Sequence, residues 1–335
     1  MLPGWDELVD DVHLVVLPMR VPFRGVVSRE AVLLRGPAGW GEFSPFVEYD
    51  DTESARWLGA AVEAAWAGWP PALRTSIPVN ATVPAVAGRD VAGVLARFPG
   101  CTTAKVKVAQ AGQSLSDDLA RVAEVRSALG ADGRVRVDAN GAWSVTEALR
   151  CLTALAPYDL EYAEQPCATL AELASLRAGL ARAGIGMLVA VDESVRKADD
   201  PARVVLAGAA DVVVLKVAPL GGVRPALEIA AACGLPVVVS SALDTSVGIR
   251  AGIALAAALP DLPYHCGLAT ASLLAGDVVR SPLLPVDGAL PVGPVAPDRD
   301  LLASWAAPPE RRRWWFARLR RCHQLLAAAA TDSGS

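Results

Sequence analysis

The sequence predicts an α/β protein with a parallel barrel and a smaller cap. From residue 77 onward, short β-branched runs alternate with Ala-, Leu-, Glu- and Arg-rich segments of helical period, a pattern typical of parallel βαβ units. Eight such runs follow one another, which fits a closed barrel better than an open sheet. The runner-up, a doubly wound sheet, lacks the glycine-rich dinucleotide-binding motif that should follow its first strand.

The first 75 residues form a mixed unit, which we expect to be an N-terminal capping domain. Residues 12–17 and 31–35 are strand-like, and residues 51–66 have helical character. Between them, residues 39–46 read Gly-Trp-Gly-Glu-Phe-Ser-Pro-Phe. This glycine and proline content predicts a turn or loop.

The barrel is expected to span residues 76–285. Its predicted strands are short, aliphatic and closely connected, and they cover residues 77–83, 103–108, 135–138, 160–163, 188–192, 212–216, 236–240 and 263–266. Residues 286–335 begin rich in proline and glycine and end in a helix-like stretch over 309–330. We expect this tail to return to the N-terminal unit, so that the two together cap the barrel mouth.

The tail contains one basic and aromatic run, Arg-Arg-Arg-Trp-Trp-Phe at residues 311–316. A run of this kind is one way to bind nucleic acid, but the net charge of -5 opposes that function. We therefore interpret the run as part of an amphipathic helix whose tryptophans pack inward and whose arginines face water.

Scarce residue types exclude several kinds of site. The chain has 3 histidines and 6 cysteines, with neither closely spaced histidine pairs nor C-x-x-C spacing, so a zinc site, a disulfide framework and a Ser-His-Asp triad are all disfavoured. The N-terminus is acidic and lacks the order of a signal peptide. We found no 18-residue stretch apolar enough to span a bilayer. These features predict a cytoplasmic protein without a membrane or nucleic-acid partner.

Lysine is rare in this chain. Lys+Arg is 31, yet the only lysines are Lys105, Lys107, Lys197 and Lys216. Two of these four lie in one tripeptide. A site that needs an amine able to lose its proton therefore has few candidates.

Polar side chains recur at the C-terminal ends of the predicted strands, the edge where parallel barrels build their active sites. They include Lys107, Asp138, Glu164, Asp192, Lys216 and Ser240, separated in turn by 31, 26, 28, 24 and 24 residues. Each step is close to one βα unit, so these residues should reach similar heights on successive strands. The two-residue period of a strand also puts Lys105 on the face of Lys107, and Arg136 and Asn140 on the face of Asp138.

Three of these residues, Asp138, Glu164 and Asp192, are carboxylates that would repel one another if they were buried together. A divalent cation relieves that repulsion, and an all-oxygen ligand set favours Mg²⁺ or Mn²⁺ over zinc. The alternative interpretation of each carboxylate is a salt bridge or a helix N-cap. The three carboxylates lie at equivalent positions on their strands, in register with the lysines, and this arrangement favours a metal site over separate salt bridges or N-caps.

Lys107 and Lys216 flank the carboxylates in chain order and should lie on roughly opposite walls. A lysine must be neutral to act as a base, and burial, the neighbouring Lys105 and a cation would all lower its pKa. An aldolase-like Schiff base would not need three carboxylates. The chemistry that fits best is proton abstraction next to a carboxylate, with a metal ion stabilising the enediolate.

Taken together, these residues resemble the enolase superfamily, and within it the muconate lactonizing enzyme subgroup. The resemblance covers nearly the whole chain, and each motif alone is weak. The motifs in order are K-x-K at 105–107, D-x-N at 138–140, E-Q-P at 164–166, D-E-S at 192–194 and Leu-Lys at 215–216. The o-succinylbenzoate synthases are the most similar members, on the evidence of residues 22–24, 39–46, 138–143 and 240–242, and of Arg136 two residues before the aspartate.

This resemblance implies a modified TIM barrel, (β/α)₇β, with an α+β cap, and a lyase that dehydrates 2-succinyl-6-hydroxy-2,4-cyclohexadiene-1-carboxylate in menaquinone biosynthesis. It implies that Lys107 is the base and then the acid, that Lys216 stabilises the intermediate, and that Mg²⁺, replaceable by Mn²⁺, is the cofactor. Asp138, Glu164 and Asp192 would be the metal ligands. The implied substrate contacts are Lys105, Asn140, Ser240 and Gly267, with Arg136 in support. The partner would be a small-molecule carboxylate, and the protein a monomer or small homo-oligomer.

Departures from the family pattern keep other activities open. Members that also racemise N-succinylamino acids tend to carry an arginine three residues after the sixth-strand lysine, where this chain has Pro219. Residues 243–246 do not strictly match the subgroup either. An N-succinylamino acid racemase, a dipeptide epimerase or a muconate cycloisomerase could use the same scaffold. The remote alternative is a non-catalytic barrel that binds a metal or a small molecule.

Overall fold

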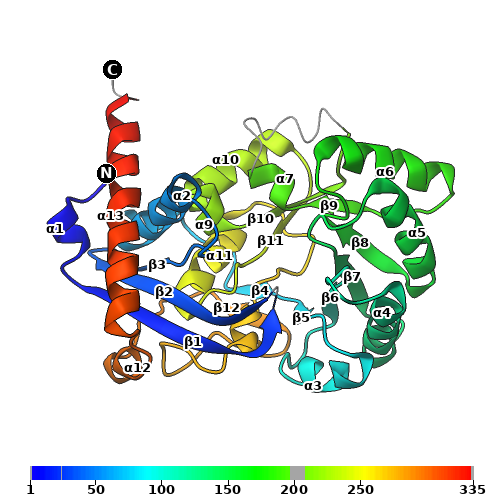
Figure 1. Cartoon of the computed structure of the whole chain (residues 1–335), viewed down its shortest axis with the longest axis horizontal. Helices are drawn as coiled ribbons and strands as arrows, with labels where there is room; N and C mark the ends of the chain where they lie inside the picture. Colours follow the sequence, from blue (N-terminus) through cyan, green and yellow to red (C-terminus); the bar gives the residue numbers. More distant parts are fainter. Residues whose placement is uncertain (1, 24, 197–207, 333–335) are drawn as a thin grey trace.

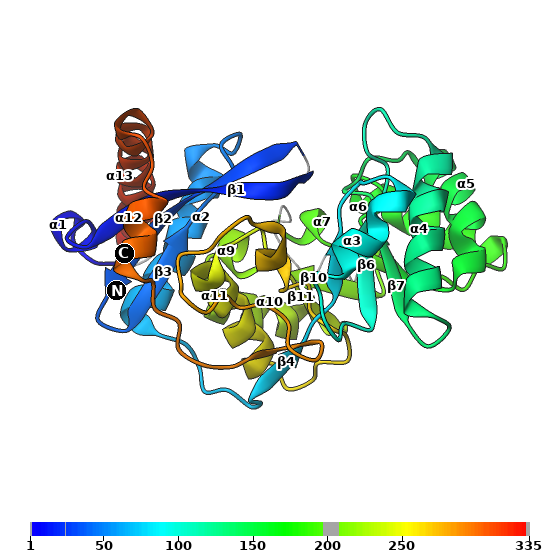
Figure 2. The same ribbon diagram turned by 90° about the horizontal axis from the view of Figure 1, so that it is seen from below.

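The computed structural model describes residues 2–23, 25–196 and 208–332. Lys197 and Arg24, the latter part of the motif at 22–24, lie outside the described residues. The cap stands at one end of the molecule and the parallel strands of the barrel occupy the other (Figure 1). A view turned by 90° shows β1 and β2 of the cap lying across the molecule on one side of the barrel (Figure 2).

The cap contains an antiparallel sheet in the order β1 (Val12–Phe23), β2 (Val26–Gly36), β3 (Gly39–Phe43). Helix α2 (Asp51–Val62) follows, capped by the Asp50 side chain, and continues as a π-helical turn. The short helix α1 (Trp5–Leu8) precedes the sheet.

The predicted turn at residues 39–46 is wrong for its first part, because residues 39–43 are strand β3. One of its two glycines, Gly41, is required by close packing. A Cβ on Gly41 would lie 2.0 Å from the carbonyl oxygen of Ala61 in α2, a separation that no side chain can adopt. The glycine therefore lets the strand and the helix approach each other, which composition alone cannot distinguish from a turn.

The barrel prediction is confirmed. Seven parallel strands of the described residues pair in sequence order: β5 (Ala81–Val83), β6 (Thr103–Lys107), β7 (Arg134–Asp138), β8 (Leu160–Glu164), β9 (Val189–Val191), β10 (Val212–Leu215) and β11 (Val237–Val239). The eighth position closes the ring through two parallel bridges, Ser240 to Gly267 and Cys266 to Val79. The predicted strand at 263–266 is thus reduced to these bridging residues.

The first predicted strand, residues 77–83, is in fact two elements. β4 (Ser76–Pro78) leaves the barrel and pairs antiparallel with β12 (Ala289–Pro291), whereas β5 belongs to the barrel. The backbone of Asn80 and Pro78 bonds to Cys266 on the closing segment. The direction of pairing changes at this point, and the uniform apolar pattern carries no sign of the change.

In the described residues, the helices that cover the outside of the barrel are α3 (Val91–Leu95), α4 (Leu115–Leu129), α5 (Val145–Leu155), α6 (Leu170–Arg182), α10 (Val223–Cys233) and α11 (Ser246–Ala258). The short helices α7 (Glu193–Arg196) and α9 (Val217–Leu220) follow the C-terminal ends of β9 and β10. Capping boxes at Ser114, Ser144 and Thr169 begin α4, α5 and α6. These caps satisfy first-turn N–H groups and fix where each loop after a strand ends. Buried aliphatic residues of the strands and helices form one large core, and a smaller separate cluster contains Tyr162, Ala190, Val212, Val214 and Val238.

The tail passes the barrel at β12 and returns to the cap through α12 (Arg299–Ser304) and α13 (Pro309–Asp332), which packs on α2. Trp315 is fully buried and donates to Glu30 of β2. Arg318 is also buried and donates to the Ser54 hydroxyl at 2.6 Å, so the expectation that the arginines of this helix face water fails there. No helix in the described ranges has the length and apolarity needed to cross a membrane.

Candidate active site

The predicted site residues of β6, β7 and β8 meet at one edge of the barrel. Lys107 pairs in register with Asp138, and Asp138 pairs with Glu164. The side chains of Lys107, Asp138, Glu164 and Asp192 are all buried. The equal heights predicted from the spacing therefore hold across these three strands, because each chain step is one βα unit.

Lys105 lies between two carboxylates. Its Nζ is 2.6 Å from Glu164 Oε1 and 3.2 Å from Asp138 Oδ2. Burial by itself would lower the pKa of Lys105, but the charges of Glu164 and Asp138 outweigh burial and hold that pKa well above its usual value. These two charges therefore favour the ammonium form of Lys105.

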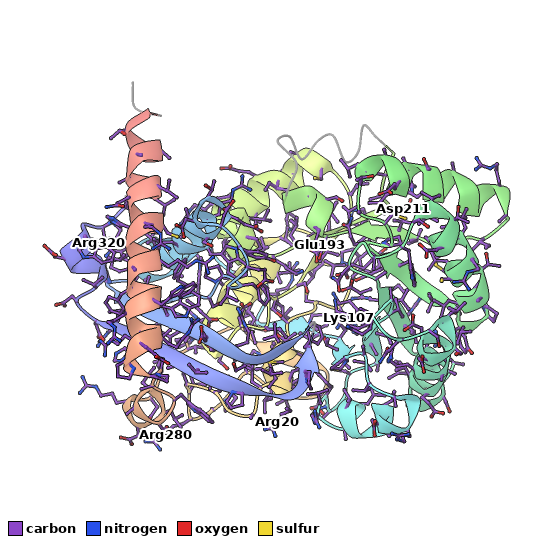
Figure 3. All side chains as sticks on the ribbon, in the orientation of Figure 1. Arg20, Lys107, Glu193, Asp211, Arg280 and Arg320 are labelled. Atoms are coloured by element: carbon purple, nitrogen blue, oxygen red, sulfur yellow. The ribbon has the colours of Figure 1, made fainter. Side chains whose placement is uncertain are left out.

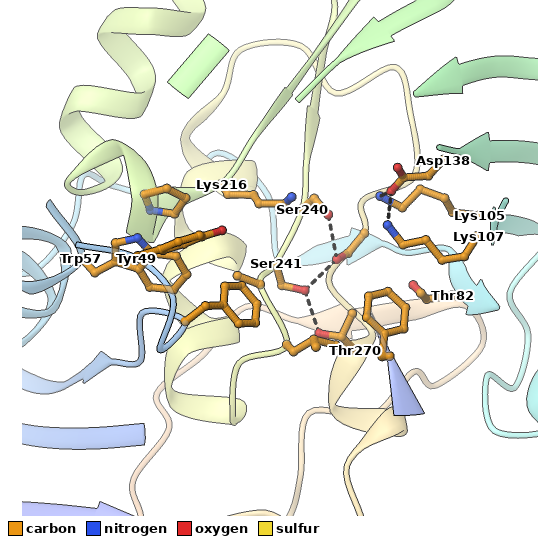
Figure 4. Close-up of a pocket in the computed structure, with 16 residues that line it drawn as sticks. Tyr49, Trp57, Thr82, Lys105, Lys107, Asp138, Lys216, Ser240, Ser241 and Thr270 are labelled. Atoms are coloured by element: carbon orange, nitrogen blue, oxygen red, sulfur yellow. Dashed lines mark hydrogen bonds and ion pairs between the residues drawn. The ribbon is translucent and has the colours of Figure 1, made fainter. Parts of the chain in front are cut away.

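Lys107 and Lys216 face the cavity from opposite sides (Figure 4). Lys107 Nζ donates to Asp138 and, at 2.7 Å, to Asn140 Oδ1, and it lies 5.2 Å from the ring centroid of Phe23. Lys216 donates to Asp192. Each lysine thus has a carboxylate beside it and an open cavity before it. Figure 3 places Lys107 near the middle of the molecule, whereas Arg280 and Arg320 lie at its periphery.

The two central carboxylates differ in character. Burial alone would raise the pKa of Asp138, but the ammonium groups of Lys107 and Lys105 hold it well below its usual value. For Glu164, burial and the charge of Asp138 together raise the pKa to about 7. Another positive charge near Glu164 would offset this cost.

The site fits a divalent cation by its donor chemistry. Glu164 Oε2 is buried and has no hydrogen-bond partner, and buried carboxylate oxygens normally have one. The neighbouring donors are carboxylate oxygens, which suit Mg²⁺ or Mn²⁺. No three His, Cys, Asp or Glu side chains of the described residues are already arranged to hold a metal ion. Instead, the ammonium groups of the lysines neutralise Asp138, Glu164 and Asp192.

Two family models cover most of the chain. The description "Enolase C-terminal domain-like" matches residues 90–298, and "Enolase N-terminal domain-like" matches residues 14–65. An o-succinylbenzoate synthase from Mycobacterium leprae is 55% identical over 99% of this chain and 97% of its own length. One from Mycolicibacterium smegmatis is 56% identical over 97% of this chain and 99% of its own. The chain belongs to the o-succinylbenzoate synthase family of the enolase superfamily.

A solved structure supports the fold. Muconate lactonizing enzyme from Pseudomonas fluorescens, complexed with muconolactone, has a TM-score of 0.72 and is 24% identical over 89% of this chain and 98% of that chain. Membership in the o-succinylbenzoate synthase family makes the chain an enzyme, and enolase superfamily members generally use a divalent metal ion. The sequence-based recognition, fold class and enzyme class are thereby confirmed.

The other predicted site residues of this o-succinylbenzoate synthase family member differ in whether they line the cavity. Ser240 and Gly267 line the cavity, and a Cβ on Gly267 would lie 2.6 Å from Ser240 Oγ. Asn140 has a φ of 47° and donates to Glu193 Oε1 at 3.1 Å, so it bridges Lys107 and the start of α7.

Arg136 lies two residues below Asp138 and does not line the cavity. Its Nη1 donates to Asn80 Oδ1 and to the backbone of His265, and its Nε donates to Glu161. The guanidinium also lies 4.7 Å from the centroid of the Tyr162 ring. Arg136 thus joins four segments of the barrel interior beneath the site.

Part of the cavity wall was not predicted from the sequence. One part is aromatic and comes from the cap: Phe23, Phe46, Tyr49 and Trp57. Another part carries hydroxyl groups, Thr82, Ser241 and Thr270. Of these residues, Phe23, Phe46 and Ser241 lie within recognised motifs, and no spacing rule links residues of the cap to the strand ends. The position of α2 against α9, just after Lys216, brings these segments together.

Proposed function

We propose that this enzyme dehydrates 2-succinyl-6-hydroxy-2,4-cyclohexadiene-1-carboxylate to o-succinylbenzoate, as a hydro-lyase of menaquinone biosynthesis. The observation that carries the proposal is the pair Lys107 and Lys216 on opposite sides of one cavity, beside three buried carboxylates. The 54–56% identity to o-succinylbenzoate synthases over nearly the full chain supports the substrate. We also propose that the enzyme acts in the cytoplasm on this free small-molecule substrate.

Asp138, Glu164 and Asp192 would hold Mg²⁺, which Mn²⁺ could replace. The bound cation would supply positive charge that stabilises the substrate carboxylate as it gains enolate character. Lys105, fixed as an ammonium group between two of these carboxylates, keeps their combined negative charge small. Asn140, Ser240 and Gly267 would contact the substrate, and Lys105 would too, while Arg136 braces the strand below.

Lys107 would remove the proton next to the carboxylate, and the electron pair of that C–H bond moves toward the carboxylate, which gains enolate character; the pair then forms the new ring double bond as the hydroxyl leaves. The C–O bond to the ring hydroxyl then breaks, and Lys107 returns its proton to the departing hydroxyl, so that water leaves and the ring becomes aromatic. Lys216 lies on the opposite side of the cavity, where its positive charge would stabilise the developing negative charge. Asn140 fixes the position of Lys107 Nζ through the 2.7 Å hydrogen bond.

The direct test is to incubate the purified protein with this substrate and Mg²⁺ and to follow the aromatic product by absorbance. We expect turnover that a chelator abolishes and that added Mg²⁺ restores. Parallel reactions with N-succinylamino acids, a dipeptide and muconate test the related activities. Racemisation of N-succinylamino acids without dehydration would refute the proposal. Pro219 lines the cavity and provides no guanidinium for such substrates.

A further inference from the structure

A buried polar cluster joins the cap to the barrel on the far side of the cavity wall. It consists of Arg29 on β2, Glu42 and Ser44 at the end of β3, and Asp244 and Thr245 in the loop between β11 and α11. All five residues are buried; for example, Glu42 is 7% exposed and Thr245 is 1% exposed. The proposed mechanism uses none of them. Their burial has a free-energy cost that needs an explanation.

Glu42 reaches from the cap to the first turn of α11. Its Oε2 accepts hydrogen bonds from Thr245 Oγ1 at 2.6 Å and from Gly248 N at 3.0 Å, and Thr245 N lies 3.2 Å from the same oxygen. Oε1 accepts from Ser44 Oγ at 2.9 Å. A carboxylate of one domain therefore satisfies the orphan N–H groups of a helix in the other.

Gly248 makes this contact possible. A Cβ at this position would lie 2.7 Å from the Asp244 Cβ and 2.9 Å from Glu42 Oε2. Both separations are shorter than normal contacts. Any other residue at position 248 would have to push the carboxylate of Glu42 away from the helix.

The segment that this cluster holds is a wall of the cavity, since Ser240, Ser241, Ala242 and Leu243 all line it. Asp244 accepts a hydrogen bond from Ala242 N at 3.0 Å, so the carboxylate braces the wall from behind.

Leu243 has a φ of 64°, in the left-handed region that a branched side chain rarely adopts. Arg29 of the cap donates to the carbonyl oxygen of Leu243 at 3.1 Å and also to Ser44 O. A strained residue persists only where its surroundings hold it in place. Here the surroundings that hold it belong to the cap.

We infer that Glu42 and Arg29 are positioning residues, which hold the 240–243 wall of the cavity in the conformation that binds substrate. The inference rests on the proposed function for its kinetic part. The wall does not include Lys107, and under the proposed function it would contact the substrate both in the bound complex and during the reaction. A displaced wall should therefore raise KM more than it lowers kcat.

The test compares Glu42→Gln with Glu30→Gln in the full-length enzyme. Glu30 is a carboxylate on a cap strand that bonds to Arg311 and Trp315 of α13 and not to the barrel loop. For Glu42→Gln we expect KM to rise about tenfold with kcat within about threefold, because a hydrogen-bond acceptor for several donors becomes partly a donor. Glu30→Gln should leave KM within about twofold of the wild-type value even where it lowers Tm.

The Gly248→Ala variant and amide hydrogen exchange provide two further tests. Gly248→Ala retains every charge and should raise KM in the same way, which covers the case in which Glu42→Gln does not fold. Amide hydrogen exchange at Ala242, Thr245 and Gly248 should be faster in both variants. Unchanged KM in both variants would overturn the positioning role, and so would unchanged exchange. If the wild-type enzyme has no dehydratase activity, the proposed function fails, and the exchange data still decide whether the cluster holds the wall.

Discussion

At the scale of single residues, the two neighbouring lysines of β6 have different environments. Lys105 contacts two carboxylates, and its pKa lies well above the usual value. Lys107 contacts Asp138 and Asn140 and faces the cavity. A lysine whose ammonium form is favoured in this way is a poor acceptor of the substrate proton. The geometry therefore favours Lys107 as the base and makes Lys105 a neutralising charge.

The base assignment predicts that Lys107→Arg is as inactive as Lys107→Ala. A guanidinium keeps its charge but stays protonated near neutral pH, so charge alone does not rescue the reaction. We expect both variants to lose at least about 10³-fold in kcat, within the range of general acid–base catalysis. Dehydratase assays measure this loss, with circular dichroism to check the fold. Turnover by Lys107→Arg near the wild-type rate would contradict the assignment.

Glu42 should also make the free energy of unfolding depend on pH. Burial and the neighbouring charge of Asp244 raise the pKa of Glu42 to about 7 from 4.5, in spite of hydrogen bonds from Thr245 and Ser44 and the charge of Arg29. A group whose pKa is raised by folding contributes stability that is fully present below pH 4.5 and is lost as pH rises through 7.

A glutamine at position 42 does not titrate, so the stability difference between wild type and Glu42→Gln should change with pH. We expect the destabilisation caused by Glu42→Gln to be largest near pH 5 and to shrink by pH 8, by on the order of 2 kcal/mol. Denaturant unfolding of both proteins at the two pH values measures it. A difference that stays constant, or that grows toward pH 8, would show that Glu42 does not titrate in this window.

At the scale of elements, the sequence predicted the parallel strands well and the cap less well. The β6–β8 strands followed directly from β-branched runs and the period of the βα unit. The predicted turn is wrong at residues 39–43, because glycine is enriched both in turns and where backbones approach closely. Only the packing of β3 on α2 separates the two causes, and that packing depends on residues such as Ala61 that no local pattern links to Gly41.

The packing explanation predicts a large effect of one methyl group. Gly41→Ala would place a Cβ 2.0 Å from Ala61 O, so we expect a loss of about 2–3 kcal/mol or more in the free energy of unfolding. The matched control is Gly93→Ala in α3, where a Cβ meets nothing within 4 Å. That change should be neutral or stabilise by up to about 1 kcal/mol. Equal effects of the two substitutions in denaturant unfolding would refute the explanation.

At the scale of the whole molecule, the barrel edge could be predicted and the cavity wall could not. Lys107, Asp138 and Glu164 come from neighbouring strands with regular spacing, and a regular fold converts that spacing into proximity. Tyr49 and Trp57 reach the cavity only because the cap docks on the barrel. That docking depends on long-range contacts such as the one from Glu42 to Thr245, which no periodicity encodes.

A divalent cation would bind the folded site and not the dispersed carboxylates of the unfolded chain, so it should raise Tm. At a concentration of 100 times Kd, the stabilisation is about 2.7 kcal/mol, which corresponds to a shift of several degrees for a chain of this size. Asp192→Asn should remove most of this shift. Asp277→Asn is the control, because Asp277 is also buried but bonds to Ser246 and Val278 instead of the site lysines. Thermal unfolding with and without Mg²⁺ or Mn²⁺ measures the shift in each protein. A shift in Asp192→Asn equal to that of the wild type would remove Asp192 from the ligand set, and the order of the shifts with the two metals would identify the preferred cation.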